Sequence, residues 1–281
     1  MDGESQRRTI SLIVDGNPRA KIFRNRNQHY STMARIFITG SADGLGQLAA
    51  KALIAQGHQV VLHARNEKRR KDARDKVPGA ENVVTADLSS IDETKQLASK
   101  VNALGKFDAV IHNAGVYQAP SDEILAINTL APYILTCLIE RPKRLIYLSS
   151  GMHLDGRSKL ESFKTDVSRI TYSDSKLHVL MLCLAVARKW PQVYANAVDP
   201  GWVPTKMGGK AAPDDLHKGY ETQWWLAASD ERRAMVSGRY FHHQKESPHN
   251  HQADDVELQE RFLSLCKEIT GVSFPSNDEA V

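Results

Sequence analysis

Residues 35–46, Arg-Ile-Phe-Ile-Thr-Gly-Ser-Ala-Asp-Gly-Leu-Gly, decide how this chain folds. The first four are mostly β-branched or aromatic and predict a buried strand. Glycines follow at positions 40, 44 and 46, and an apolar helical pattern then runs from Leu45 to Gln56. Such a turn can simply serve a backbone that needs positive φ. Between a strand and a helix, however, it also exposes the N–H groups of the helix start, which attract a pyrophosphate. The stretch therefore predicts a strand–turn–helix unit that binds a dinucleotide.

Short apolar runs alternate with longer amphipathic ones along the rest of the chain. This alternation indicates an α/β protein, a parallel sheet with helices on both faces. Right-handed crossovers make the sheet doubly wound, a Rossmann fold of about seven strands. Besides the first strand and helix, strands are predicted at 59–63, 82–86, 107–112, 144–148, 193–198 and 237–241, and helices at 67–76, 92–104, 124–139, 172–190, 220–228 and 255–269.

The pattern predicts one domain at residues 33–271, with an N-terminal extension at 1–32 and a polar tail at 272–281. The extension contains several arginines, but its acidic residues argue against a transit peptide, and it lacks the apolar block of a secretory signal. We expect it to be disordered. Met33, directly before the first strand, is an alternative natural start.

Composition narrows the function class. The 281 residues are 41% hydrophobic and 25% charged, as in ordinary globular proteins. The net charge of +4 and the lack of a basic run with interleaved aromatics argue against nucleic-acid binding. No apolar stretch approaches the roughly 18 residues of a membrane span. Cys137, Cys183 and Cys266 lie in apolar helical patterns, which predicts buried free thiols, no metal site and a cytoplasmic location.

A phenol and an ammonium stand four residues apart in Tyr172-Ser173-Asp174-Ser175-Lys176. On a helix this spacing puts Tyr172 and Lys176 on one face. A nearby ammonium favours the phenolate, so it is expected to lower the tyrosine pKa from about 10 toward neutrality. Such a tyrosine can exchange a proton with a carbonyl or an alcohol. A surface pair without a function is the alternative.

The glycine spacing G-x-x-x-G-x-G and the Y-x-x-x-K pair together make the chain resemble the short-chain dehydrogenase/reductase superfamily. The resemblance covers nearly all of residues 34–270. One departure is His112, where the family has a second asparagine. Further landmarks follow in the family's order: Asp87-Leu88, Asn113-Ala114-Gly115, Asn128, Ser149-Ser150 and Pro200-Gly201-Trp202-Val203-Pro204-Thr205.

The resemblance implies a nicotinamide cofactor. NAD-preferring members have an acidic residue where the second strand ends, but this chain has His63-Ala64-Arg65-Asn66. A carboxylate there repels a 2′-phosphate, whereas Arg65 can bind one, so NADP (NADPH) is predicted over NAD. The alternative is that Arg65 is solvated, as we expect for Arg69, Arg70 and Lys71. The other implied cofactor contacts are Gly40, Ser41, Gly44, Leu45, Gly46, Asp87, Leu88, Asn113, Ala114, Gly115, Tyr172, Lys176, Pro200, Gly201, Val203 and Thr205.

The resemblance also implies the catalytic roles. Tyr172 would donate the proton, Lys176 would lower its pKa and bind the nicotinamide ribose, and Asn128 would hold a water that links Lys176 to solvent. Ser150 would bind the substrate oxygen as an oxyanion donor does. Many members place this serine nearer the tyrosine, where this chain has Lys159. Retinol-dehydrogenase-like members share an insertion, here 151–171, and the pattern Ser-Ser-x-x-His, which favours Ser150 over the alternatives Ser149 and Ser158.

The expected reaction is NADPH-dependent reduction of a ketone or aldehyde, or the reverse oxidation of an alcohol. A catalytically idle NADP-binding sensor or scaffold is the alternative. A dehydratase or epimerase is disfavoured, because the chain lacks the G-x-x-G-x-x-G turn and the larger C-terminal domain of those relatives. A homodimer or homotetramer would form through the helices at 124–139 and 172–190. An apolar substrate would contact Met152, His153, Leu154, Trp202, Met207 and the loop at 206–216.

Overall fold

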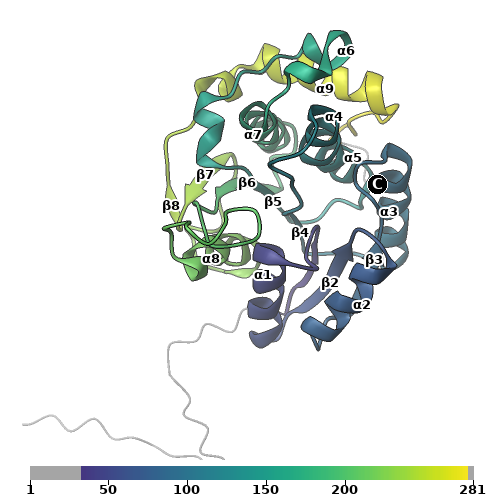
Figure 1. Ribbon diagram of the computed structural model, residues 1–281, viewed down its shortest axis with the longest axis vertical. Helices are drawn as coiled ribbons and strands as arrows, with labels where there is room; N and C mark the ends of the chain where they lie inside the picture. The colour runs from purple at the N-terminus through teal and green to yellow at the C-terminus, as the bar shows by residue number, and fades with distance from the viewer. Residues whose placement is uncertain (1–32, 278–281) are drawn as a thin grey trace, which may run out of the picture. The chain divides into compact units, whose positions relative to one another are not determined.

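The computed structural model describes residues 33–277, which form an eight-stranded sheet with the order β3-β2-β1-β4-β5-β6-β7-β8 (Figure 1). Predictions for residues 1–32 and 278–281 lie outside this range. Every neighbouring pair of strands is parallel except β7 and β8. The strands are β1 (Arg35–Ile38), β2 (Gln59–Ala64), β3 (Asn82–Thr85), β4 (Ala109–His112), β5 (Arg144–Leu148), β6 (Tyr194–Asp199), β7 (Arg239–His242) and β8 (Lys245–Glu246).

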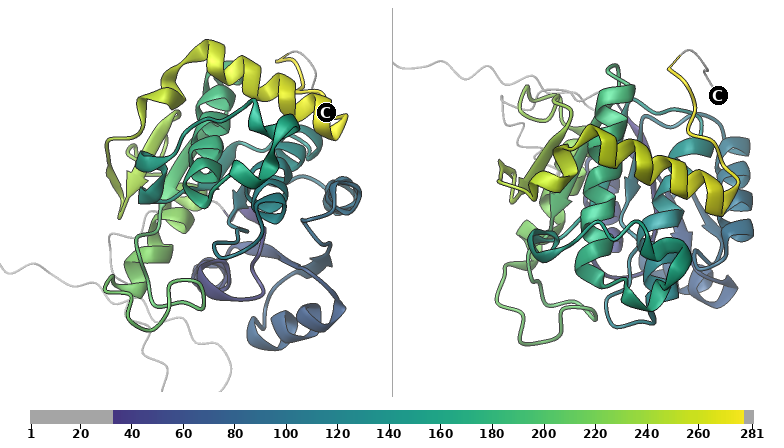
Figure 2. Two further views of the ribbon diagram at one scale, coloured as in Figure 1. Left: turned by 45° about the horizontal axis from the view of Figure 1, so that its top comes forward. Right: turned by 90° about the horizontal axis from the view of Figure 1, so that it is seen from above.

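Helices cover both faces of the sheet, which confirms the doubly wound α/β fold (Figures 1 and 2). Side chains alternate along each strand between two cores. On β5, Leu145 and Tyr147 join the core with α3, α5 and α7, while Ile146 and Leu148 join the core with α1 and α8. The helices are α1 (Gly44–Ala55), α2 (Glu67–Lys76), α3 (Ile91–Ala103), α4 (Ser121–Ile124), α5 (Ala131–Leu138), α6 (Ser162–Thr165), α7 (Tyr172–Lys189), α8 (Leu216–Ala228) and α9 (Val256–Thr270).

The strand order contains a switch point beside β1. This strand lies between β2 and β4, so the connections leave it toward opposite edges of the sheet. In such sheets a crevice opens outside the carboxyl ends of the strands at that point. The glycine-rich turn follows β1 directly, and therefore lies in this crevice.

Helix α9 and the C-terminal residues 272–277 pack over α7 and α5. Helix α9 crosses over α7, as the two views in Figure 2 show, and residues 174–186 of α7 are all buried. Residues 272–277 also lie against these helices: Tyr133 donates a hydrogen bond to the Val272 carbonyl at 2.7 Å, and Phe274 packs on Trp190. The helix faces predicted to join subunits are thus covered by the chain itself, and the oligomeric state stays a prediction.

Two further predictions concern the cysteine thiols and a membrane span. Cys137, Cys183 and Cys266 are buried and free, as predicted. Among residues 33–277, no helix is both long enough and apolar enough to cross a bilayer.

Candidate active site

The glycine-rich turn packs against the segment that follows β4. A Cβ on Gly40 would lie 2.8 Å from Ala114 Cα, and one on Gly46 would lie 2.4 Å from the Asn113 amide nitrogen. That amide donates to the Thr39 and Gly40 carbonyls at 2.9 and 3.1 Å. Gly40 and Gly46 are therefore required for a close approach, while Gly44 has a positive φ of 57° and open space around it.

Ser41 is turned away from the cleft. Its hydroxyl donates to the Ile38 carbonyl at 2.8 Å and accepts from the His63 amide at 2.9 Å, and the residue is fully buried. The hydroxyl predicted to contact the cofactor thus has two partners within the protein, and Ser41 does not line the cleft. His63 completes the arrangement: its Nδ1 accepts from the Gly40 amide and its Nε2 lies 3.0 Å from the Ala86 carbonyl. Nothing in the sequence pattern indicated this buried histidine, which ties three strand ends together.

A cleft of about 330 Å³ opens at this switch point and brings most of the predicted cofactor residues together. Gly46, Gly201 and Val203 do not line it. Gly201 has a positive φ of 78°, and Val203 is buried, so both shape the loop after β6 instead. The predicted residues that do line the cleft are Gly40, Gly44, Leu45, Arg65, Asp87, Leu88, Asn113, Ala114, Gly115, Tyr172, Lys176, Pro200 and Thr205.

The cleft holds more basic side chains than the sequence suggested. Arg69 lines it beside Arg65, and its guanidinium lies 3.0 Å from the Asp43 carboxylate. The expectation that Arg69 is part of a solvated face is therefore wrong, because the first turn of α2 borders the cleft. Lys206 also binds Asp43. Burial raises the pKa of Asp43, but hydrogen bonds from Lys206, the Gly44 amide and Arg69 outweigh it and lower that pKa to about 2.

Tyr172 and Lys176 lie together at the start of α7, as their spacing predicts. The Lys176 ammonium is 5.4 Å from the Tyr172 ring centroid, and it donates to the Leu148 carbonyl at 2.8 Å. Lys176 is only 4% exposed. Leu148 ends β5, so this hydrogen bond fixes the ammonium where α7 meets the sheet.

The pKa of Tyr172 moves opposite to the expectation. Burial raises it to about 12, and a hydrogen bond with Ser150 offsets this only in part. Burial also lowers the pKa of Lys176 to about 8. The predicted lowering of the Tyr172 pKa by Lys176 is therefore wrong for this arrangement, because removing water from the phenolate costs more than the hydrogen bond with Ser150 returns. Tyr172 is a protonated phenol at neutral pH.

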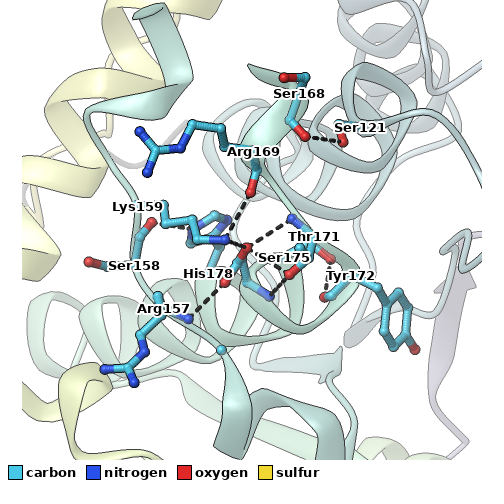
Figure 3. Close-up of polar contacts among 12 residues, drawn as sticks. Ser121, Arg157, Ser158, Lys159, Ser168, Arg169, Thr171, Tyr172, Ser175 and His178 are labelled. Carbon is cyan, nitrogen blue, oxygen red and sulfur yellow. Dashed lines mark hydrogen bonds and ion pairs between the residues drawn. The ribbon is translucent and has the colours of Figure 1, made fainter. Parts of the chain in front are cut away.

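The three candidate serines differ in what their hydroxyls contact. Ser150 lies close enough to Tyr172 to lower the pKa of the phenol, and its hydroxyl oxygen accepts a hydrogen bond from the Met152 amide at 3.2 Å. Ser149 is buried and donates to the Lys176 carbonyl at 2.8 Å. In Figure 3, Ser158 lies on the other side of Lys159 from the Tyr172 ring. Ser150 is therefore the serine that interacts with the phenol, whereas Ser149 lines the cleft but uses its hydroxyl on the Lys176 carbonyl.

Asn128 lies in η1 (Leu125–Leu130), a π-helical segment that joins α4 to α5. Its amide nitrogen donates to the Val116 carbonyl at 2.8 Å and to the Ser175 hydroxyl at 3.0 Å, and its oxygen accepts from the Val116 amide. The side chain is 1% exposed. It therefore fastens the segment after β4 to α7, and both of its N–H groups are already used.

One aromatic side chain contacts Tyr172, and another is held in the loop after β6. Tyr117 packs edge-on against the Tyr172 ring at 4.8 Å, and the indole of Trp202 is pinned by a 2.8 Å hydrogen bond to the Gly208 carbonyl. His153 is different: it is buried and its Nδ1 is 2.7 Å from the Ser150 carbonyl, so it supports Ser150 and does not line a pocket as predicted. Tyr117 and four of the predicted substrate contacts are exposed: Met152, Leu154, Trp202 and Met207.

Comparisons with known proteins agree with this geometry. The family model of the short chain dehydrogenases matches residues 34–216. An uncharacterized oxidoreductase of Emericella nidulans is 46% identical over 257 residues, which cover 86% of this chain and 99% of that protein. A short-chain dehydrogenase of Penicillium rubens is 40% identical, with 87% and 100% covered. The solved structure of a blue fluorescent protein from a metagenomic library in complex with NADPH shares the fold, with a TM-score of 0.62 at 19% identity over 74% of this chain and 95% of that one. This chain is therefore an oxidoreductase that belongs to the short-chain dehydrogenase family.

Proposed function

We propose that this protein reduces the carbonyl group of an apolar ketone or aldehyde with NADPH, or runs the reverse oxidation of the alcohol. The observation that carries the proposal is that Tyr172 and Lys176 line the cleft that begins at the glycine-rich turn, with Ser150 close enough to Tyr172 to lower its pKa. A phenol, an ammonium and a hydroxyl at one point form a proton donor with a hydrogen-bonding partner for an oxygen.

The cleft fits a phosphorylated dinucleotide. Gly40 and Gly44 line the cleft without a side chain, and the start of α1 faces it, which suits a pyrophosphate. No carboxylate ends β2, while Arg65 and Arg69 line the cleft where it borders α2. Asp43, an acid that lines the cleft near α2, is already bound by Arg69 and Lys206. Positive charge near the ribose favours a 2′-phosphate, so NADPH is the proposed cofactor, and the NADPH in the similar solved structure agrees with this choice.

The bound nicotinamide would supply the hydride for the carbonyl carbon. Tyr172, protonated at neutral pH, would give its hydroxyl proton to the carbonyl oxygen. Ser150 would donate to the same oxygen and hold it against the phenol. Lys176, fixed by the Leu148 carbonyl, would place a positive charge beside the phenolate that remains. Asn128 would act by holding the β4 segment against α7.

Exposed apolar side chains support an apolar substrate: Met207 lines the cleft, and Tyr117 packs on Tyr172. Trp202 is 59% exposed yet held by its indole hydrogen bond, so it offers a fixed aromatic surface.

Since the thiols are free and buried, we also propose a cytoplasmic location.

The test is steady-state oxidation of NADPH and of NADH with a panel of apolar ketones and aldehydes. We expect turnover with NADPH, and a 10- to 100-fold rise in the KM for NADPH, roughly, when Arg65 is replaced by alanine. The KM for NADH should not change. Arg70→Ala is the matched control, because Arg70 pairs with Glu67 on the exposed side of α2. Equal NADPH and NADH efficiencies in the wild type would reject the cofactor assignment.

An idle NADPH-binding protein is the competing function. It would bind NADPH with the same dependence on Arg65 but would oxidise it with no carbonyl in the panel. The filled positions Ser150, Tyr172 and Lys176 favour an enzyme, because a protein that only binds the cofactor needs no proton donor.

A further inference from the structure

A single buried carboxylate joins the segment at 151–171 to the first turn of α7. Asp174 accepts hydrogen bonds from the Arg157 amide at 2.8 Å, from Lys159 Nζ at 2.8 Å, and from the amide and hydroxyl of Thr171 at 2.8 and 2.7 Å. Figure 3 shows Arg157, Lys159 and Thr171 converging from three directions beside Tyr172. The side chain of Asp174 is 2% exposed. This buried carboxylate therefore accepts four hydrogen bonds, all from residues 157–171, which precede Tyr172.

The conformation of Lys159 brings its ammonium to this carboxylate. Its backbone has a positive φ of 42°, uncommon for a residue with a side chain, and its ammonium also donates to the Arg169 carbonyl at 2.9 Å. Nearby, a Cβ on Gly156 would lie 2.5 Å from the Ser173 carbonyl oxygen, so the segment touches the backbone of the first turn. The ammonium thus joins both ends of the segment to α7.

The position of Tyr172 depends on this junction. Tyr172 is the first residue of α7, and Thr171 and Asp174 form the capping box around it. Its ring points away from Lys159 (Figure 3), toward the cleft that it lines. A buried ion pair that loses one member leaves an uncompensated charge, which disturbs its surroundings more than the loss of an exposed pair does.

We propose that Lys159 is a positioning residue for Tyr172, acting through Asp174 to hold the first turn of α7 in the orientation that proton donation needs. The proposal rests on the proposed function, in which Tyr172 gives a proton to the substrate. It gives a role to the lysine that stands where many relatives have their active-site serine.

The test is Lys159→Met, which keeps most of the side-chain length and removes the charge. A displacement of about 1 Å at a reacting group can cost on the order of 100-fold in rate, so we expect kcat to fall at least tenfold, roughly. The Kd for NADPH, measured by fluorescence, should stay within about twofold, because the glycine-rich turn and Arg65 are untouched. Lys159→Arg, which keeps the positive charge, should retain most of the wild-type kcat. Lys164→Met is the matched control, since Lys164 lies on the same segment but pairs with Glu268 at the surface.

Two further measurements keep the outcomes distinct. Asp174→Asn should lower kcat as Lys159→Met does, and the double variant should lose no more than either alone, as for two residues acting as a unit. Hydrogen exchange of residues 172–176 should speed up in Lys159→Met and not in Lys164→Met. Unchanged kcat and unchanged exchange in Lys159→Met would overturn the proposal. Faster exchange in a protein whose wild type turns over no carbonyl would instead reject the proposed function and leave the junction intact.

Discussion

Gly46 is the glycine of the turn whose replacement has the most direct structural consequence. In Gly46→Ala the new Cβ would lie 2.4 Å from the Asn113 amide nitrogen, 2.9 Å from its Cγ and 3.0 Å from the Gly40 carbonyl oxygen. No flexible side-chain end is available to yield, because Asn113 is held by the Thr39 and Gly40 carbonyls. The amide must move and break these hydrogen bonds, which join the ends of β1 and β4.

The expected loss of stability follows from three contributions. The two hydrogen bonds contribute about 1 kcal/mol each, and forced overpacking costs about 1–3 kcal/mol. Alanine in place of glycine in a helix returns up to about 1 kcal/mol. The free energy of unfolding should therefore fall by about 3 kcal/mol, which lowers Tm by roughly 6–12 °C for a domain of this size. Affinity for NADPH should fall as well, because the turn is displaced.

The assay is thermal unfolding together with NADPH titration, and Gly57→Ala is the matched control. Gly57 has a positive φ of 90° with nothing within 4 Å of its missing Cβ, so alanine there meets strain without a clash. We expect a loss of about 1–2 kcal/mol and an unchanged affinity for NADPH. If Gly46→Ala unfolds at the wild-type temperature, the close packing of turn and β4 segment is not what requires glycine.

Three more outcomes follow from the site and the core. Lowering the pH from 7 to 5 should reduce the free energy of unfolding by about 2 kcal/mol for each of three buried histidines. The folded pKa of each histidine lies below its unfolded pKa, so only the unfolded chain takes up the proton in this range. Denaturant titration at each pH measures the change. These histidines, with burial as the main cause, are His63 (pKa about 4), His112 (about 3) and His178 (about 4). The kcat/KM for carbonyl reduction should decline above about pH 8, where Lys176 loses its proton, and a flat profile from pH 7 to 10 contradicts that role. Ser150→Ala should lower kcat about 100-fold, whereas Ser149→Ala should mainly lower stability by about 1 kcal/mol; comparable kcat losses would mean that the serines were assigned wrongly.

The elements of the sheet were readable from the sequence because burial on both faces produces continuous apolar runs. The strand at 144–148 and the start of the helix at Tyr172 were predicted to the residue. β8 was missed, since two exposed residues, Lys245 and Glu246, carry no apolar pattern. The short helix α6 was missed for a related reason: it depends on contacts of the 151–171 segment, not on its own periodicity.

Site residues could be predicted where a motif fixes the backbone conformation. The direction of a side chain was harder to predict where several hydrogen-bonding or charged partners are available to it. Ser41 turns inward because the Ile38 carbonyl and the His63 amide offer it two buried partners. Arg69 points into the cleft because Asp43 attracts it there. The direction of the Tyr172 pKa depends on burial, which four residues of sequence cannot convey. Each of these outcomes is set by neighbours distant in the chain.

The central claim is that Tyr172 gives the proton to the substrate oxygen, and Tyr172→Phe tests it most directly. The substitution removes only the hydroxyl, so the NADPH affinity should stay within about threefold of the wild type while kcat for carbonyl reduction falls about 100-fold or more. Turnover of Tyr172→Phe at the wild-type rate, with NADPH bound normally, would contradict the claim.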